Sequence, residues 1–119
     1  LKPDLKLDEL SLSPSFYQEL DENYDGFRSH VLISAHQFSE DWNVWEQHPQ
    51  GDELVVLMSG AAELILGTRD EEKIEQLSKP GDFVRVPQGV WHTAKVTESA
   101  SMLFITAGEG TRNHQKPDR

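Results

Sequence analysis

The stretch WEQHPQGDELVVLMSG, residues 45–60, decides the fold, because polar side chains stand directly before an almost unbroken apolar run. Side chains alternate across a β-strand, so Glu46 and His48 point to the same face. The turn at residues 49–52 leads into a second strand that begins with Glu53. If this turn folds the second strand back beside the first, Glu53 faces the same space as Glu46 and His48. The three side chains then form a ligand set; the alternative is a surface histidine beside two solvated acids.

A second stretch, PGDFVRVPQGVWHTAKV at residues 80–96, contains a Gly-Asp turn, a strand, a Pro-Gln-Gly turn and a strand that resumes at His92. Ala94 and Val96 share the face of His92, because side chains alternate along a strand. One polar residue followed by small and apolar residues on one face is the pattern of a single buried ligand. Taken alone, a histidine here is more often structural or partly exposed.

The composition limits the classes of function. The 119 residues contain no cysteine, so His, Asp and Glu are left for metal binding or acid–base chemistry. The formal net charge of -10 disfavours nucleic acids and anionic membranes as partners, because binding phosphates requires clustered Lys or Arg. No apolar stretch has the length of a membrane span, and LKPDLKLDEL lacks the features of a signal peptide. We therefore expect a single-domain, soluble, cytoplasmic protein.

Turn residues divide most of the chain into short β-rich runs, which is typical of a sandwich or barrel. Residues 1–28 are predicted to form an arm and a short helix, with Ser13 as its cap and Pro14 at its first position. Residues 29–108 are predicted to form the barrel, and residues 109–119 a polar C-terminal tail. The expected strands are HVLISAHQF, DWNVWEQHP, ELVVLMSG, AELILGT, DFVRVPQG, WHTAKVT and SMLFITAG. The charged segment TRDEEKIEQLS indicates a hairpin with a solvated strand, or a wide turn.

The two stretches resemble the two motifs of the cupin superfamily and occur in the same order. The residues around them are similar to those of a group of small bacterial cupins. EQHPQGDELVVLMSG resembles the first motif from its second histidine onward, and GDFVRVPQGVWH resembles the second motif. The matching residues are His48, Glu53, Gly60, Gly81, Pro87, Gly89 and His92. The resemblance covers residues 42–105. It implies an all-β fold, a small antiparallel β-barrel or jelly roll, here with a short N-terminal helix.

The chain departs from the cupin pattern at three positions. Glu46 stands where the family usually has its first histidine, Val96 replaces the final asparagine, and the leading glycine of the first motif is absent. The resemblance implies one divalent metal ion, either iron, manganese, zinc or nickel, with Glu46, His48, Glu53 and His92 as its ligands. A carboxylate in place of an imidazole favours harder ions. Glu46 is otherwise a free general base beside an open coordination position.

The resemblance implies a protein that acts on, or binds, a small organic molecule inside the barrel. One hypothesis is a metal-dependent enzyme of an oxygenase or isomerase kind, with the metal as Lewis acid or oxygen-activating centre. The other is a non-catalytic module that binds a small molecule or has a structural role. A homodimer is also predicted, because both alternating sets of side chains in ELVVLM are largely apolar and one barrel interior buries only one set.

Several other residues invite a functional interpretation. The three tryptophans are expected mainly to pack in the core or an interface: Trp42, Trp45 and Trp91. Three histidines are expected to be structural or exposed: His30, His36 and His114. Arg85 is the one charged residue in an apolar strand, so it points to solvent or reaches a buried anion, and solvent is the favoured alternative.

Overall fold

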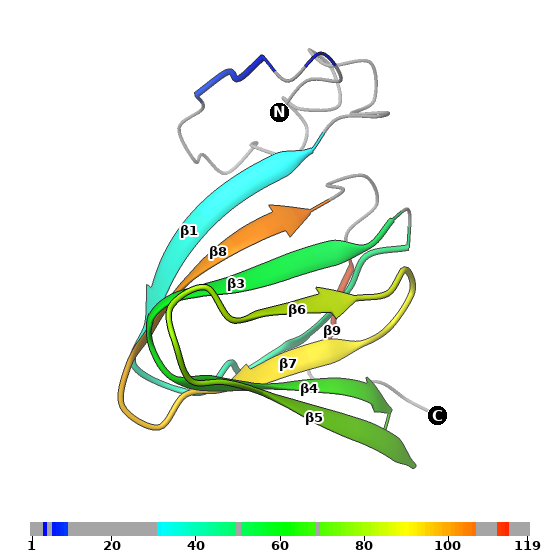
Figure 1. Cartoon of the computed structure of the whole chain (residues 1–119). Helices are drawn as coiled ribbons and strands as arrows, with labels where there is room; N and C mark the ends of the chain where they lie inside the picture. Colours follow the sequence, from blue (N-terminus) through cyan, green and yellow to red (C-terminus); the bar gives the residue numbers. More distant parts are fainter. Residues whose placement is uncertain are drawn as a thin grey trace.

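The protein folds as two antiparallel β-sheets that face each other (Figure 1). The structure is a computed structural model and describes residues 4, 6–9, 31–49, 51–68, 70–106 and 112–114. Within these ranges, no helix has the length and apolarity needed to cross a membrane. The short helix that the sequence predicts after Ser13 lies outside the described residues. The all-β prediction is confirmed.

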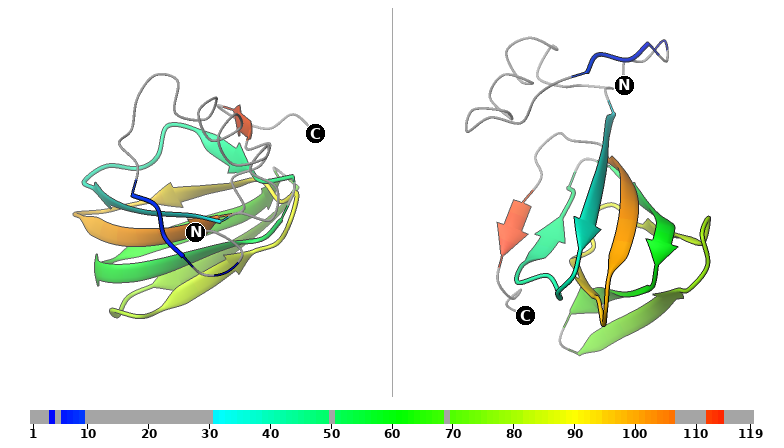
Figure 2. Two further views of the ribbon diagram at one scale, coloured as in Figure 1. Left: turned by 90° about the horizontal axis from the view of Figure 1, so that it is seen from above. Right: turned by 90° about the vertical axis from the view of Figure 1, so that its left-hand side faces the viewer.

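Consecutive strands often lie in different sheets. The four-stranded sheet has the order β1 (Leu32–Phe38), β8 (Ala100–Thr106), β3 (Glu53–Gly60) and β6 (Phe83–Val86). The five-stranded sheet has the order β5 (Glu71–Leu77), β4 (Ala62–Thr68), β7 (His92–Lys95), β2 (Trp45–Gln47) and β9 (Arg112–His114). Figure 2 shows the same arrangement from two further directions. The chain thus crosses between the sheets from β1 to β2 and again from β2 to β3.

The core lies between the sheets and is filled by every second residue of the strands, as the period of two requires. On β3, Val55 and Leu57 are fully buried, whereas Met58 on the other face is 42% exposed. On β8, buried and half-buried residues alternate along the whole strand. The buried cluster comprises Val55, Leu57, Ala62, Leu64, Leu66, Leu77, Val84, Val86, Ala94, Val96, Ala100, Met102 and Phe104.

The segment between β1 and β2 forms a loop rather than the long strand that DWNVWEQHP suggested. The strand within it is limited to Trp45–Gln47. Two hydrogen bonds attach the loop to β7 and the residue after it: the amide of Trp42 donates to the carbonyl oxygen of Ala94 at 3.0 Å, and the amide of Val96 donates to Oδ1 of Asp41 at 2.7 Å. These bonds hold residues 39–44 as one wall of the interior.

Two charged or polar segments take part in the sheets. The segment TRDEEKIEQLS contains β5, which pairs with β4 along its length and is largely exposed, so the solvated strand is confirmed. Within the predicted polar tail, residues 112–114 form β9 and pair with β2. Gly60 at the end of β3 has a φ of 81°, and a Cβ there would collide with the carbonyl oxygen of Ser99. The motif glycine is therefore required by the backbone.

Candidate metal centre

Glu46 and His92 lie opposite each other on neighbouring strands. β2 pairs with β7 in antiparallel fashion, and the register makes Glu46 and His92 direct partners. Side chains of direct partners project from the same face with Cβ atoms about 4.5–5.5 Å apart. The pairing of a strand from the first stretch with a strand from the second therefore brings two predicted ligands together.

His48 follows β2 directly and is 4% exposed. Its carbonyl oxygen accepts a hydrogen bond of 3.0 Å from the amide of Gly89 in the Pro-Gln-Gly turn. Gly89 has a φ of 77°, a left-handed conformation that glycine adopts without strain. The turn thus docks on the backbone of His48 and fixes the second stretch against the first.

Glu53 begins β3 in the other sheet and is 2% exposed. The hydroxyl of Thr106 on β8 donates a hydrogen bond of 2.6 Å to Oε2 of Glu53. The position of Glu53 corrects one expectation, because β3 is not folded back beside β2. β3 pairs with β6 and β8 instead, and Glu53 reaches Glu46 and His48 from the opposite sheet. The cluster is therefore formed across the sandwich, because the chain passes from one sheet to the other between β2 and β3.

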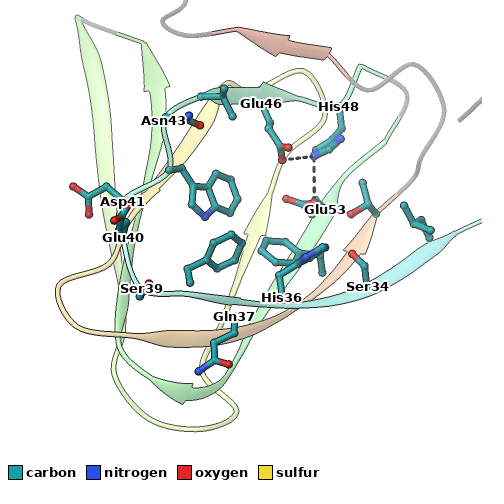
Figure 3. A pocket seen from close by; sticks show the side chains of 16 residues that line it. Ser34, His36, Gln37, Ser39, Glu40, Asp41, Asn43, Glu46, His48 and Glu53 are labelled. Atoms are coloured by element: carbon teal, nitrogen blue, oxygen red, sulfur yellow. Dashed lines mark hydrogen bonds and ion pairs between the residues drawn. The ribbon is translucent and has the colours of Figure 1, made fainter. Parts of the chain in front are cut away.

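The four side chains converge on one point. Nε2 of His48 lies 3.2 Å from Oε2 of Glu53, and Nε2 of His92 lies 3.0 Å from Oε1 of Glu53. Oε1 of Glu46 lies 3.9 Å from Nε2 of His48 and 3.8 Å from Nε2 of His92. One ligand atom of each residue lies within 4.8 Å of all the others. Figure 3 shows Glu46, His48 and Glu53 pointing toward one another.

A backbone contact orients the ring of His92. Nδ1 lies 3.3 Å from the carbonyl oxygen of Val90. A carbonyl oxygen can only accept a hydrogen bond, so this contact places a proton on Nδ1, and in the neutral ring the lone pair is then on Nε2. Histidines that bind metals are commonly held in this way by the second ring nitrogen. Nε2 of His92 is therefore presented to Glu53 and Glu46 as a ligand atom.

The donor set fits a divalent metal ion. Oε1 of Glu53 and Nε2 of His92 are buried and close together, yet neither forms a hydrogen bond of suitable geometry. Buried polar atoms without a hydrogen bond are uncommon. With metal–ligand bonds of about 2.0–2.2 Å, neighbouring ligand atoms lie roughly 3.0–3.5 Å apart, as do the Glu53–histidine pairs. Two imidazole nitrogens and two carboxylates could thus hold one ion.

The electrostatics of the metal-free site keep Glu53 charged. Burial alone raises the pKa of Glu53, but the nearby rings of His48 and His92 outweigh burial and lower the pKa to about 2. Burial lowers the pKa of His92, but the Glu53 carboxylate outweighs this and raises the pKa above 6.5. The pKa of Glu46 is raised from 4.5 by burial and by the neighbouring charge of Glu53. The site therefore attracts positive charge, either protons or a cation.

A cavity of about 570 Å³ adjoins the cluster. Its wall consists mainly of β1 and the loop that leads to β2, and Figure 3 labels Ser34, His36 and Asn43 among the residues around it. The lining residues are Leu32, Ser34, His36, Gln37, Phe38, Ser39, Glu40, Asp41, Trp42, Asn43, Val44, Glu46, His48, Glu53, Phe104 and Thr106. The volume is sufficient for a small organic molecule.

Two residues that the sequence did not assign to the site line this cavity. His36 was expected to be structural or exposed; it is exposed, and its ring contacts Phe38 and Phe104 with centroids 6.0 and 5.7 Å away. Trp42 packs against the core and also lines the cavity. The alternation Ser34–His36–Phe38 on one face of β1 is the sequence signal that could have placed His36 on the face that lines the cavity. Trp42 lies in a loop, where no periodicity applies.

The remaining residues singled out in the sequence lie away from the cavity or outside the described part. Arg85 is exposed, and its Nη1 donates to Oδ2 of Asp52 at 2.9 Å, in agreement with the solvent alternative. Trp45 and Trp91 are half-buried and do not line the cavity. His30 and the side chain of His114 lie outside the described residues.

Comparison with known proteins identifies the family. The model of the cupin domain matches residues 35–108, which is more than half of the chain. The chain belongs to the cupins. The match includes both stretches that carry the four clustered residues. The family match, the fold and the two motifs therefore all indicate the same family. Among curated proteins, no sequence matches this cupin.

Three solved structures show what the fold is similar to. A cupin superfamily protein from Desulfitobacterium hafniense is 28% identical, with a TM-score of 0.54 over 64% of this chain and 65% of that chain. The hydroxypropylphosphonic acid epoxidase of S. wedmorenis, solved with fosfomycin, is 17% identical, with a TM-score of 0.56 over 66% of this chain and 44% of the epoxidase. The Drosophila melanogaster CENP-C cupin domain is 12% identical, with a TM-score of 0.52 over 62% of this chain and 59% of that chain. The latter two show the fold alone.

Proposed function

We propose that this cupin binds one divalent metal ion and acts on a small organic molecule in the adjoining cavity. The main observation in support of this proposal is that Glu46, His48, Glu53 and His92 bring potential ligand atoms within 4.8 Å of one another beside that cavity. Burying Oε1 of Glu53 and Nε2 of His92 without hydrogen bonds is costly, and a bound cation would offset this cost. The proposed ligand set is the one that the sequence predicts.

The chain's own residues prepare the proposed site. Thr106 holds Oε2 of Glu53 and the carbonyl of Val90 holds Nδ1 of His92, so the ligand atoms are oriented before an ion arrives. When bound, a divalent ion supplies Lewis acidity toward a substrate oxygen or, if it is iron or manganese, redox chemistry. Residues 39–44 line one side of the cavity in which the substrate is proposed to bind. Displacement of water from this cavity by a bound substrate would strengthen electrostatic interactions within it.

Glu46 has two possible roles in the proposed enzyme. As a ligand, it completes a set of two imidazoles and two carboxylates, and we favour this role because Glu46 occupies the position of the first family ligand. As a general base, it takes a proton from a substrate or water, and its raised pKa and 28% side-chain exposure are consistent with that task. Its longer distances to the histidine nitrogens are compatible with either role.

The ion is proposed to be iron(II) or manganese(II). Two histidines with one carboxylate are typical of non-haem iron oxygenases, and additional carboxylates favour harder ions over copper or nickel. The fold of HppE, which has been solved in an Fe(II) form, is similar with a TM-score of 0.56 at 17% identity. This chain spans 43% of the HppE chain, so the comparison supports the scaffold and not the reaction.

A non-catalytic binding module is the second candidate. If Glu46 is a ligand, it is no longer free to act as a base. Asp41, another carboxylate at the cavity, already accepts the amide of Val96. The fold of Drosophila melanogaster CENP-C, solved bound to CAL1, is similar with a TM-score of 0.54 at 11% identity. In this candidate the metal and the cavity serve only to hold a ligand.

The metal content of protein purified without a metal-affinity tag tests the proposal. We expect one ion per chain by inductively coupled plasma mass spectrometry, and iron or manganese would favour the enzyme. Zinc or nickel would support the site and leave both candidates in place. Protein that contains no ion and takes up none on titration with iron(II), manganese(II), zinc(II) or nickel(II) would contradict the proposed site.

A homodimer is the proposed assembly. The outer face of the four-stranded sheet carries apolar residues in register across its strands, so that Ile105 lies between Ile33 and Leu54. Phe83 at one end of the next row is 64% exposed, and Ile33 is 39% exposed. Exposed apolar side chains grouped on one face are typical of interfaces. We propose that a second copy of the chain covers this face.

A further inference from the structure

The charge of the cavity wall restricts the ligand that it can hold. Among the described residues that line the cavity, none is Lys or Arg, whereas four are carboxylates: Glu40, Asp41, Glu46 and Glu53. The two carboxylates at the metal cluster balance the charge of a divalent ion. Glu40 and Asp41 then leave the cavity with negative charge. The formal net charge of -10 for the chain acts in the same direction on an approaching ligand.

One side of the cavity is aromatic. The ring centroids of Phe38 and Trp42 are 5.5 Å apart, those of Trp42 and Phe104 are 5.7 Å apart, and those of Phe38 and Phe104 are 6.2 Å apart. The faces of aromatic rings carry partial negative charge and attract cations, most strongly where water is excluded. Three rings that contact one another beside carboxylates form an environment for a positively charged group.

We infer that the ligand of this cavity is a small organic cation, such as a molecule with an ammonium or quaternary ammonium group on an apolar body. The inference deepens the proposed function and rests on it for the location of the metal. The aromatic side formed by Phe38, Trp42 and Phe104 receives the cationic group, and the apolar body fills the space beside the metal cluster. A carboxylate, phosphate or phosphonate group meets no Lys or Arg side chain among the described lining residues.

The inferred charge of the ligand differs from that of the substrate of a protein with a similar fold. The epoxidase with the similar fold acts, by its name, on a phosphonic acid, which is an anion at neutral pH. The cavity described here adjoins the cluster of Glu46, His48, Glu53 and His92, and its described lining residues include no Lys or Arg. The shared fold is therefore not expected to extend to the charge of the substrate.

Binding of three probes of similar size tests the inference. Isothermal titration calorimetry at pH 8 on the full chain loaded with zinc(II) compares benzyltrimethylammonium, benzyl alcohol and phenylacetate. We expect the cation to bind roughly threefold to thirtyfold more tightly than the alcohol, and phenylacetate to bind most weakly. Phenylacetate can coordinate the metal and the quaternary ammonium cannot, so the metal favours the probe that the inference expects to bind most weakly. Equal or tighter binding of either other probe, or no binding of the cation, would overturn the inference.

A matched pair of variants locates the binding. Phe38→Leu removes one ring of the aromatic side and is expected to weaken binding of the cation by roughly threefold or more, with little effect on the alcohol. Phe83→Leu makes the same change on the outer face of the four-stranded sheet, within the proposed dimer interface and away from the cavity, and is expected to leave binding of the cation unchanged. Equal losses in both variants would contradict the assigned location.

The metal content of the same samples distinguishes the two proposals. Protein that binds the cation but no metal would overturn the proposed function and retain the inferred ligand class. Protein that binds metal but prefers phenylacetate would retain the metal site and overturn the ligand class.

Discussion

Glu53 and His92 reach toward each other from opposite sheets, and Oε1 of Glu53 lies 3.0 Å from Nε2 of His92. Glu53 belongs to β3 of the four-stranded sheet, and His92 belongs to β7 of the five-stranded sheet. An ion bound by both residues connects the two layers of the sandwich. The proposed site and the fold therefore depend on each other for stability.

Removal of the metal is expected to destabilise the protein. A ligand that binds only the folded state at a free concentration about a thousand times its Kd stabilises by about 4 kcal/mol. Thermal and urea unfolding with and without a chelator measure this difference. His92→Ala serves as the control, because a chelator should have little effect on a variant that holds no ion. Identical midpoints for the wild-type protein under both conditions, after confirmed metal loading, would argue against a stabilising site.

The two buried histidines are expected to be essential for metal binding. His48→Ala and His92→Ala each remove a neutral nitrogen ligand and should each lower affinity by at least roughly a hundredfold. His36→Ala is a matched control, since His36 lines the cavity but does not belong to the cluster of four. Metal titration followed by elemental analysis gives the affinities. Full occupancy in His92→Ala would exclude the site as described.

The pH dependence of stability should differ in sign between the metal-free and metal-bound forms. The raised pKa of His92 means that its contribution to the metal-free fold is complete below pH 6.5 and is lost as pH rises through the folded-state pKa. A metal ion must displace this proton, so metal affinity is highest above the folded-state pKa of His92 and falls as pH decreases through it. Glu53, with a pKa of about 2, stays charged throughout this window.

Urea unfolding at several pH values between 6 and 8 checks these opposite slopes. Stability of the metal-free protein should decrease as pH rises, whereas the stabilisation by metal should increase. Parallel slopes in the two forms would mean that His92 does not exchange a proton for the ion.

Replacement of Glu46 by glutamine distinguishes its two proposed roles. If Glu46 is a ligand, Glu46→Gln should weaken metal binding by roughly tenfold to a hundredfold, because an amide oxygen is neutral and a weaker donor. If Glu46 is a general base, metal affinity should be nearly unchanged and turnover of an identified substrate should be lost. Metal titration gives the first result without a known substrate. Unchanged affinity in Glu46→Gln would refute the favoured role as a ligand.

A lysine on the outer face of the four-stranded sheet is expected to separate the proposed dimer. Val56 on β3 is half-buried on that face, and Val56→Lys places a charge within the proposed interface. Ile74→Lys makes a comparable change on β5, where Ile74 is 56% exposed. Light scattering at micromolar concentration should show a dimer for the wild type and Ile74→Lys, and a monomer for Val56→Lys. A monomeric wild type would refute the proposed assembly.

Local sequence patterns predicted the strands well where alternation is regular. The runs ELVVLMSG and AELILGT correspond to β3 at Glu53–Gly60 and β4 at Ala62–Thr68. The resemblance to the two cupin motifs also implied the four residues that cluster. The strand predictions follow from short-range geometry, because the period of a strand and the glycine positions of its turns are properties of consecutive residues.

Only the tertiary structure decided how these strands combine. Alternation indicates which face a side chain occupies but not which sheet a strand joins, so the sequence placed Glu53 beside β2 whereas β3 lies in the opposite sheet. The contacts of His36 and the inward placement of Trp42 depend on hydrogen bonds and packing between segments far apart in the chain. The sequence alone therefore determined the charge and, through the resemblance to the cupin motifs, the four residues that cluster, while long-range pairing determined the shape and lining of the cavity.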